Sequence, residues 1–390
     1  MKILSILSYY YPHWTGLTAY AQRLAEGLVE RGHEVTILTS RHDPTLPREE
    51  VYNGVRVVRL PVLFRLSRGP VCPTFPFTAY RLIREHDVVQ IHTVLMEAWL
   101  VTILARLAGR KVLFTHHGDL VMPAGFLNRI IERSVTWMMT QAEKISARIS
   151  IHSEDYARNS SFLSPFLAKM AFIYPPIVIP EPDRQAVADW RSELGLDSNP
   201  LIGFAGRFVE EKGFDYLFEA IPHILKSYPN ARFVYAGEFP VYENFYGQCE
   251  QLLDGCSDHV TFLGLIRDRQ KLADFYSMCD VFVLPSRSDC FPSTQIEAMF
   301  CGTPVVCTDI PGAREAVKAT GMGIIVPSRD VGALVEGVGH MLDSATTYRK
   351  TREEVASVFN LERTVDQYEA LLAELAGVSP DTLGKVEAGC

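Results

Sequence analysis

The stretch from residue 201 to residue 214 reads LIGFAGRFVEEKGF, and it decides the fold of the second half of the chain. It begins as a short apolar β-strand. Ala205 and Gly206 are small enough for the backbone to approach a ligand, Arg207 and Lys212 follow, and a helix begins at once. A strand, a basic loop and a helix N-terminus in this order predict a phosphate or diphosphate site, although a solvated charged loop has the same pattern.

Strand-like segments alternate with amphipathic segments along the whole chain. The clearest helix signal lies between 21 and 29, where apolar residues recur at i, i+3, i+4, i+7 and i+8. Such alternation is typical of parallel sheets covered by helices on both faces. The predicted strands are 3–7, 35–38, 55–60, 88–91, 112–114 and 149–151 in the first half, and 201–204, 233–236, 260–263, 281–284, 305–307 and 323–326 in the second.

Two domains are expected from the length and from a proline-rich break. The chain has 390 residues, which is more than one hydrophobic core usually serves. Residues 174–182 read YPPIVIPEP, a stretch that cannot carry a helix and makes a semi-rigid connector. We therefore predict an α/β protein with two doubly wound domains, 1–175 and 183–360, and an amphipathic helix after the second.

Charge is distributed unevenly along the chain. The net charge is −8 with 22% charged residues, which argues against a protein that coats nucleic acid. Residues 1–175 contain 20 lysines and arginines against 14 acidic residues, whereas 176–390 contain 18 against 32. The two domains are therefore expected to face different partners. The eight cysteines form no CxxC pair and the N-terminus lacks a signal-peptide pattern, so we expect a reduced, cytoplasmic compartment.

A second loop follows the strand at 281–284 and reads PSRSDCFPSTQIE. Ser293 and Thr294 are favoured N-cap residues, and they predict a helix start whose free N–H groups form a second anion site. Asp289 on the loop and Glu297 in the first turn are carboxylates, which suit sugar hydroxyls rather than phosphate. Each is also common in turns and helix starts that bind nothing.

With these motifs the chain resembles the retaining glycosyltransferases of the GT-B fold, in the large family four that includes sucrose synthases and mannosyltransferases. The resemblance covers nearly the whole chain. It rests on Gly-Arg-x4-Lys-Gly at 206–213, Pro-Ser at 285–286, and a carboxylate-x7-glutamate motif at 289–297 that continues into EAMFCGTPVV. It implies two Rossmann-like domains that face each other across a cleft, with the C-terminal helix, about 361–376, returning to the acceptor-side first domain.

The resemblance assigns roles to residues of the second domain, which binds the nucleotide sugar. Arg207 and Lys212 would neutralise the departing diphosphate. Glu297 would bind the ribose hydroxyls. Asp289, one of two catalytic candidates, would bind the hydroxyls of the transferred sugar. Main-chain amides would bind the diphosphate at three further residues: Phe291, Ser293 and Thr294.

In the first domain the resemblance points to a glycine loop and a histidine. Gly16 follows the first strand within PHWTG and would lie against the donor diphosphate. His117, the second catalytic candidate, would contact the sugar; the Thr-x-His register selects it over His116, which we interpret as a hydrogen-bonded turn residue.

The chain departs from the family's pattern in three places. Leu17 stands where the first loop usually has a second glycine, and Asp289 stands where the family usually has glutamate. Pro292 replaces a glycine and removes one amide donor. These departures concern the contacts with the sugar, and they leave the predicted diphosphate site intact.

The resemblance therefore implies a metal-independent retaining hexosyltransferase that needs no cofactor. It would move a sugar from a nucleotide-diphospho-sugar to a glycan, glycolipid or small-molecule acceptor in cell-surface polysaccharide or glycoconjugate synthesis. The chain has no Asp-x-Asp motif and no GxGxxG after the first strand, which counts against metal-dependent GT-A enzymes and dehydrogenases. Two alternatives stay open: a GT-B epimerase or phosphorylase, and a non-catalytic sugar-nucleotide-binding subunit.

Two segments of the basic first domain mix apolar and basic residues. These segments could bind the protein peripherally to the inner face of an anionic membrane, and such a location would suit a lipid-linked acceptor. Packing of these segments on their own sheet is the alternative, and no nucleic-acid partner is expected. The segments comprise Leu63, Phe64, Arg65, Leu66 and Arg68, and then Leu127, Arg129, Ile130, Ile131, Arg133 and Met138.

Overall fold

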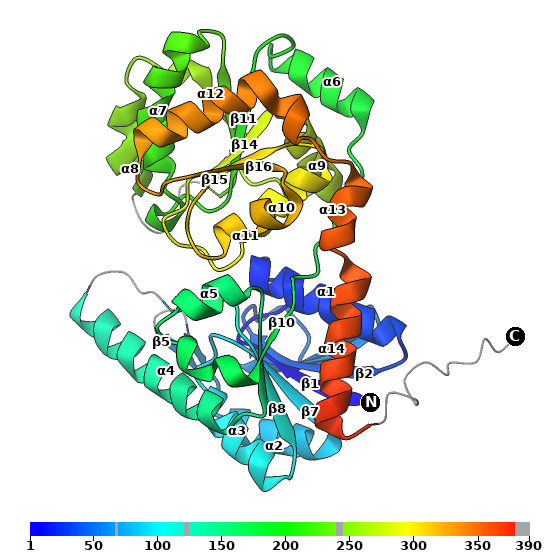
Figure 1. Ribbon diagram of the computed structural model, residues 1–390. Coiled ribbons are helices and arrows are strands. Elements are labelled where there is room, and N and C mark those ends of the chain that lie inside the picture. Colours follow the sequence, from blue (N-terminus) through cyan, green and yellow to red (C-terminus); the bar gives the residue numbers. More distant parts are fainter. Residues whose placement is uncertain (67–68, 121–124, 239–244, 379–390) are drawn as a thin grey trace, which may run out of the picture. The chain divides into compact units, whose positions relative to one another are not determined.

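The computed structural model describes residues 1–66, 69–120, 125–238 and 245–378, and it divides the chain into two compact units (Figure 1). Unit 1 comprises Met1–Pro176 and the segment from Leu361 onward, and unit 2 comprises Ile177–Asn360. The proline-rich stretch from 174 to 182 contains no helix or strand. The last helix, α14 (Leu361–Ala376), belongs to unit 1.

Unit 1 is built on an eight-stranded sheet with the order β10-β9-β8-β7-β1-β2-β4-β3. Its strands are parallel except for β3, which pairs antiparallel with β4 at one edge. A separate two-stranded ribbon, β5 (Phe64–Leu66) with β6 (Gly69–Val71), is antiparallel. The bounds in the large sheet are β1 (Lys2–Ile6), β2 (Glu34–Arg41), β3 (Glu49–Tyr52), β4 (Val55–Pro61), β7 (Val88–His92), β8 (Lys111–Thr115), β9 (Arg148–Ile151) and β10 (Met170–Phe172).

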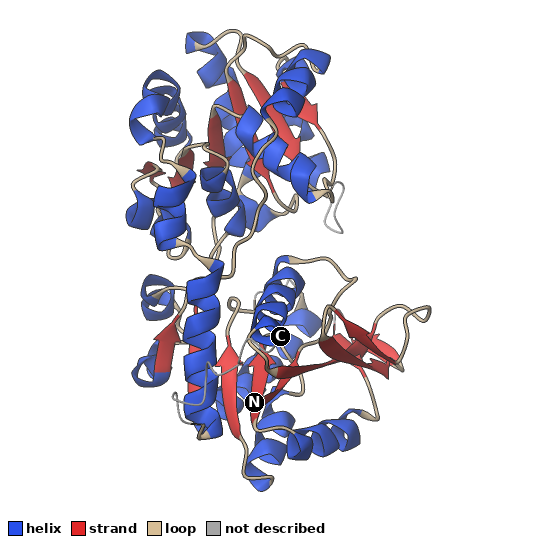
Figure 2. Ribbon diagram, turned by 90° about the vertical axis from the view of Figure 1, so that its right-hand side faces the viewer, coloured by secondary structure: helices blue, strands red, loops and turns tan. Residues whose placement is uncertain are grey.

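Helices cover both faces of this sheet (Figure 2). Because successive strand residues point to opposite faces, Leu4 and Ile6 pack in the core beneath α2 and α3, whereas Ile3 packs in the core beneath α1 and α14. α14 is held to α1 by a hydrogen bond between the hydroxyls of Tyr20 and Tyr368, 2.5 Å apart. The helices are α1 (Gly16–Glu30), α2 (Phe75–Glu85), α3 (Ala98–Leu107), α4 (Phe126–Ile145), α5 (Glu154–Asn159) and α14.

Unit 2 has a six-stranded, all-parallel sheet with the order β13-β12-β11-β14-β15-β16. Its strands are β11 (Leu201–Ala205), β12 (Arg232–Ala236), β13 (Val260–Phe262), β14 (Val281–Leu284), β15 (Val305–Thr308) and β16 (Gly323–Val326). Its helices are α6 (Arg184–Glu193), α7 (Phe214–Ser227), α8 (Phe245–Cys249), α9 (Arg269–Met278), α10 (Ser293–Phe300), α11 (Ala313–Thr320), α12 (Val331–Tyr348) and α13 (Arg352–Val358).

Both sheets have a point where the strand order reverses. In unit 1 this point lies between β1 and β7, and in unit 2 between β11 and β14. Parallel strands end at the same edge of a sheet, and ligands of such folds bind beyond those ends at the reversal point. The loops to examine are therefore 7–15 and 93–97 in unit 1, and 206–213 and 285–292 in unit 2.

The predicted fold class is confirmed: each unit is a doubly wound, Rossmann-like α/β layer structure. All twelve predicted strands are present, and the helix predicted over 21–29 is α1. The sequence analysis missed β3, β5, β6 and β10. Among the described residues, no helix combines the length and the hydropathy that crossing a bilayer requires.

Candidate active site

The basic loop and the carboxylate loop of unit 2 meet at an ion pair. Lys212 ends a short 3₁₀ turn (Glu210–Lys212) after β11, and its Nζ lies 2.5 Å from Oδ2 of Asp289 in the loop after β14. Both side chains are largely shielded, with 18% and 16% of their surface exposed. Arg207, just after β11, is exposed. The structure thus brings together the residue predicted for the phosphate and the residue predicted for the sugar.

Helix α10 begins four residues after Asp289, with an uncapped N-terminus. The sequence analysis was wrong about the cap: the N-cap residue is Pro292, whose side chain makes no capping hydrogen bond, and Ser293 and Thr294 are the first two residues of the helix. A free first turn supports an anion site, because its N–H groups have no partner within the helix. Within the described part of the chain, the buried Thr294 hydroxyl also has no hydrogen-bond partner. Phe291, in the preceding loop, is buried.

Glu297 lies further along the helix than predicted. It is the fifth residue of α10, in the second turn rather than the first, and it is 6% exposed. Tyr276 donates a hydrogen bond to its Oε2 over 3.0 Å, and Nη1 of Arg269 lies 3.5 Å from its Oε1. The neighbouring Tyr276 has a raised pKa because of its burial and the Glu297 charge. Glu297 is therefore a carboxylate that its neighbours hold in place.

The glycine of the 206–213 motif has a steric role. Gly213 adopts φ +67°, and a Cβ added there would lie 2.1 Å from the carbonyl oxygen of Pro285. This close approach brings the loop that carries Lys212 against the loop that carries Asp289. Only glycine permits both the backbone conformation and the contact.

Replacing Gly213 by alanine is expected to destabilise unit 2 by at least about 2 kcal/mol, because left-handed strain and the clash with Pro285 act together. Gly195→Ala is the matched control. Gly195 has nearly the same φ, +66°, but nothing lies within 4 Å of its added Cβ. Urea unfolding of both variants measures the difference in the free energy of unfolding. Equal decreases in the two variants would show that the contact between Gly213 and Pro285 contributes nothing to stability.

In unit 1, the loop after β1 leads into a well-capped helix. Gly16 is the first residue of α1, it is exposed, and nothing lies within 4 Å of its added Cβ. Thr15 caps the helix by accepting from the Thr18 N–H, and the Thr18 side chain accepts from the Thr15 N–H in return. Gly16 thus lies at an exposed position in the first turn of this capped helix, where a ligand can approach the backbone.

His117 belongs to a cluster of imidazoles at the carboxyl ends of β7, β8 and β9. Its Nε2 lies 2.9 Å from Nδ1 of His92, whose Nε2 lies 3.0 Å from the Ser5 hydroxyl. His152 and Tyr20 pack against it, with ring centroids 5.6 and 4.7 Å away. Burial lowers the pKa of His92 to about 3 and that of His152 to about 4, and it holds the pKa of His117 well below 6.5. At neutral pH these rings are uncharged.

The neighbouring His116 is a different kind of residue. It is fully buried, its Nε2 lies 3.3 Å from Asp119, and its Nδ1 lies 3.6 Å from the buried Glu143. Burial opposes a charge on this ring, but the two carboxylates prevail and raise its pKa above the usual value. His116 therefore has polar partners inside unit 1.

The sequence analysis missed His92 and His152. Each ends or directly follows a buried strand, β7 and β9, so the rule that placed His117 after β8 would have placed them beside it. Among the described residues, no group of three or more histidine, cysteine, aspartate or glutamate side chains is arranged to hold a metal ion.

Comparison with known sequences identifies both units. Residues 187–357 match the family described as Glycosyl transferases group 1, and residues 15–164 match the Glycosyl transferase 4-like domain. One relative is the GDP-mannose-dependent alpha-(1-6)-phosphatidylinositol monomannoside mannosyltransferase of Mycolicibacterium smegmatis, 30% identical over 85% of this chain and 86% of its own. Another is an uncharacterised glycosyltransferase of Methanocaldococcus jannaschii, 29% identical over 88% of this chain and 89% of its own.

Solved structures share the fold. The sucrose-phosphate synthase from Thermosynechococcus elongatus has a TM-score of 0.73 and 22% identity, covering 97% of this chain and all of that one. Anabaena HepE in complex with UDP and glucose has a TM-score of 0.77 and 18% identity, covering 96% of this chain and all of that one.

Proposed function

The chain belongs to the group 1 glycosyl transferases, and on this premise we propose that it is a retaining hexosyltransferase whose donor is a nucleotide-diphospho-sugar. Unit 2 binds the donor, and unit 1 binds a glycan, glycolipid or small-molecule acceptor. The product belongs to cell-surface polysaccharide or glycoconjugate synthesis. His117 contacts the transferred sugar, and Gly16 leaves room for the donor diphosphate.

The observation that carries this proposal is the Lys212–Asp289 pair, whose carboxylate lies in the loop that leads directly into the N-terminus of α10. A sugar linked to a diphosphate presents hydroxyls and anionic oxygens side by side, and the pair offers one acceptor and one cation at adjacent positions. Arg207 and the first amides of α10 supply further positive charge for the diphosphate. Glu297, held by Arg269 and Tyr276, receives the ribose hydroxyls.

The reaction breaks the bond between the anomeric carbon and the diphosphate oxygen and forms one between that carbon and an acceptor oxygen. The acceptor proton leaves with the diphosphate, and substitution occurs on the same face, so the configuration is retained. Negative charge develops on the departing oxygens. Cations and helix amides aimed there stabilise the transition state more than the ground state, so we propose that no metal or other cofactor is required.

Thermal-shift measurements with a panel of nucleotide sugars test donor binding. A true donor is expected to raise the melting temperature as its concentration rises, since it binds the folded state alone. With an acceptor present, the expected product is a free nucleoside diphosphate. Release of a sugar 1-phosphate on addition of inorganic phosphate would indicate a phosphorylase instead, and unchanged melting curves across the panel would contradict the proposal.

We also propose a cytoplasmic enzyme that contacts the inner face of an anionic membrane through α4. The exposed side of this helix presents Phe126, Ile130 and Trp137 together with Arg129 and Arg133. The seven described cysteines are buried and free of disulfides, which suits a reducing compartment. Two predicted members of the apolar–basic segments, Arg68 and the Leu127 side chain, lie outside what the structure describes. Sedimentation with phosphatidylserine vesicles, but not with phosphatidylcholine vesicles, is the expected result.

A further inference from the structure

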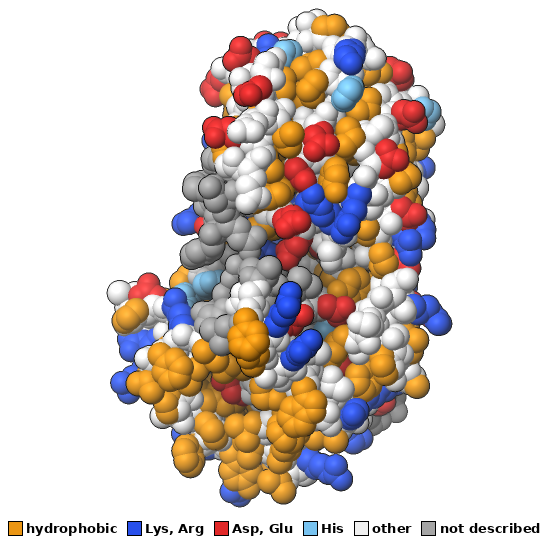
Figure 3. Space-filling model, turned by 90° about the vertical axis from the view of Figure 1, so that its left-hand side faces the viewer, with side chains coloured by type: hydrophobic (Ala, Val, Ile, Leu, Met, Phe, Trp, Pro, Cys, Tyr) orange, Lys and Arg blue, Asp and Glu red, His pale blue; other side chains and the backbone are white. Residues whose placement is uncertain are grey.

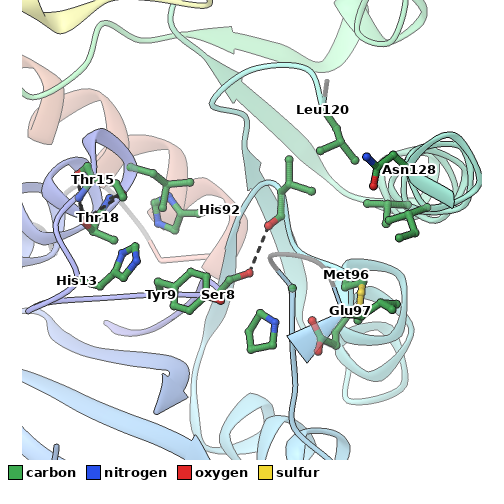
Figure 4. Close-up of a pocket in the computed structure, with 17 residues that line it drawn as sticks. Ser8, Tyr9, His13, Thr15, Thr18, His92, Met96, Glu97, Leu120 and Asn128 are labelled. Atoms are coloured by element: carbon green, nitrogen blue, oxygen red, sulfur yellow. Dashed lines mark hydrogen bonds between the residues drawn. The ribbon is translucent and has the colours of Figure 1, made fainter. Parts of the chain in front are cut away.

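A pocket of about 340 Å³ opens in unit 1 at the point where its strand order reverses (Figure 4). One wall comes from the carboxyl ends of β1 and β7 and from the start of α1. The other comes from the β5–β6 ribbon, the loop after β7 and helix α4. In Figure 4, His13, Thr15 and Thr18 lie on one side of the pocket, and Leu120 and Asn128 lie across from them.

The two walls differ in chemistry. The first carries hydroxyl and imidazole groups, including Ser8, whose hydroxyl donates to the Val94 carbonyl over 3.4 Å. The second is largely apolar, although Glu97 and Asn128 add polar groups to it. Burial raises the pKa of Glu97. The apolar side chains of the second wall are Leu66, Pro70, Val94, Met96, Leu120, Ile131 and Val135.

The polar wall reaches the proposed catalytic histidine. His92 lines the pocket, and its Nδ1 lies 2.9 Å from Nε2 of His117. A molecule in the pocket is therefore one side chain away from the ring that we propose to contact the transferred sugar. This position suits the acceptor.

The apolar wall continues onto the surface. Leu66 lines the pocket and is 43% exposed. Phe64 in the same strand is 53% exposed, and Leu63, just before the strand, is 70% exposed. On α4, Ile131 faces the pocket while Phe126 and Ile130 are exposed at 84% and 47%. Figure 3 shows one face of the molecule, and on that face apolar side chains gather on the surface of unit 1. Apolar surface thus leads from the solvent into the pocket.

A free sugar fits this lining poorly. It carries a hydroxyl on almost every ring carbon, and hydroxyls turned toward Leu66, Ile131 and Val135 would find no hydrogen-bond partner there, which costs free energy. A hydrocarbon chain has no polar groups that need hydrogen bonds on that wall, and its transfer out of water is favourable in free energy. An acceptor with a hydroxylated head and an apolar chain uses both walls.

We propose that this pocket binds a lipid acceptor. The hydrocarbon chain of the lipid lies between the β5–β6 ribbon and α4, and its hydroxylated head lies toward His92. The inference rests on the proposed function, and it narrows the acceptor from glycans, glycolipids and small molecules to one class. The exposed apolar residues at the rim are where the chain enters.

Binding of two probes with the same head tests the proposal: n-octyl glucoside below its critical micelle concentration, and methyl glucoside. Each buried methylene favours binding by about fourfold. Octyl glucoside is therefore expected to bind the full-length protein at least a hundredfold more tightly, as measured by isothermal titration calorimetry. In the double variant Leu66→Gln, Ile131→Gln the preference is expected to fall at least tenfold.

Leu107→Gln is the matched control, because Leu107 is 73% exposed at the end of α3 and does not line the pocket. It is expected to keep the full preference. Equal binding of the two probes by the unaltered protein, or an unchanged preference in the double variant, would overturn the lipid acceptor. The nucleotide-sugar thermal shift, measured on the same samples, separates the outcomes: donor binding without chain preference rejects only this inference, whereas absence of donor binding rejects the proposed function.

Discussion

Replacing Lys212 by alanine is expected to lower the rate of sugar transfer by a hundredfold to about a thousandfold. Removing one preorganised group that stabilises charge in a transition state has effects of this size. Lys212 lies 2.5 Å from Asp289 in the loop that leads into α10, where we place the departing diphosphate. Its ammonium group meets a charge that grows as the bond breaks, so kcat falls more than donor affinity. Steady-state kinetics with saturating acceptor measure the two parameters separately.

The ion pair needs its own control, since the alanine variant leaves Asp289 without its partner. If the pair only joins two loops, the double variant Lys212→Ala, Asp289→Asn would recover most of the activity, because no partly buried charge is left uncompensated. The proposed roles predict no recovery. Lys226→Ala is the matched control, because it also removes one lysine but at the exposed far end of α7, and it should leave the rate of sugar transfer unchanged. A Lys212→Ala enzyme with more than a third of the original kcat would contradict the assignment.

The strands that form the two cores were predictable because parallel strands are buried on both faces and therefore form apolar runs. The missed strands lack that pattern. β3 (Glu49–Tyr52) lies at a sheet edge with charged residues, and β10 (Met170–Phe172) has three residues. β5 and β6 also have three residues each and form a ribbon outside the large sheet. Such segments are fixed by their pairing, and pairing depends on residues elsewhere in the chain.

The loops that carry the site residues could be predicted from the sequence, but the contacts between those residues could not. The loops after β11 and β14 could be found from their sequence, but the approach of Lys212 to Asp289 joins residues 77 positions apart. The N-cap of α10 is Pro292 because of its backbone conformation, whereas the usual preference for serine or threonine caps pointed one or two residues too far along the chain. The imidazole cluster and the pocket of unit 1 depend on which strands are neighbours, and single-sequence periodicity carries no strand order.

Replacing His117 and His116 by alanine, one at a time, is expected to give different phenotypes. His117→Ala should lower kcat a hundredfold or more while donor binding stays nearly unchanged, because this ring is proposed to contact the sugar. The lost contact with His92 should cost less stability than the change at His116. His116→Ala should lower the stability of unit 1 by about 3 to 5 kcal/mol, because it leaves Glu143 and Asp119 without their cationic partner. Single-turnover kinetics and denaturant unfolding separate the two effects.

The pH dependence distinguishes the two rings further. The pKa of His117 lies well below 6.5 because of its burial and the adjacent His92 and His152, so its state does not change between pH 6 and 8 and it should add no step to the rate profile there. The pKa of His116 is raised in the folded state, so its stabilising contribution is complete below pH 6.5 and is lost as the pH rises through the folded value. Unfolding curves of the unaltered protein should show this loss, and His116→Ala should abolish it. A step in the rate profile near pH 6.5 that His117→Ala removes would show that the ring titrates, and it would contradict a role for His117 as a neutral hydrogen-bonding partner of the sugar.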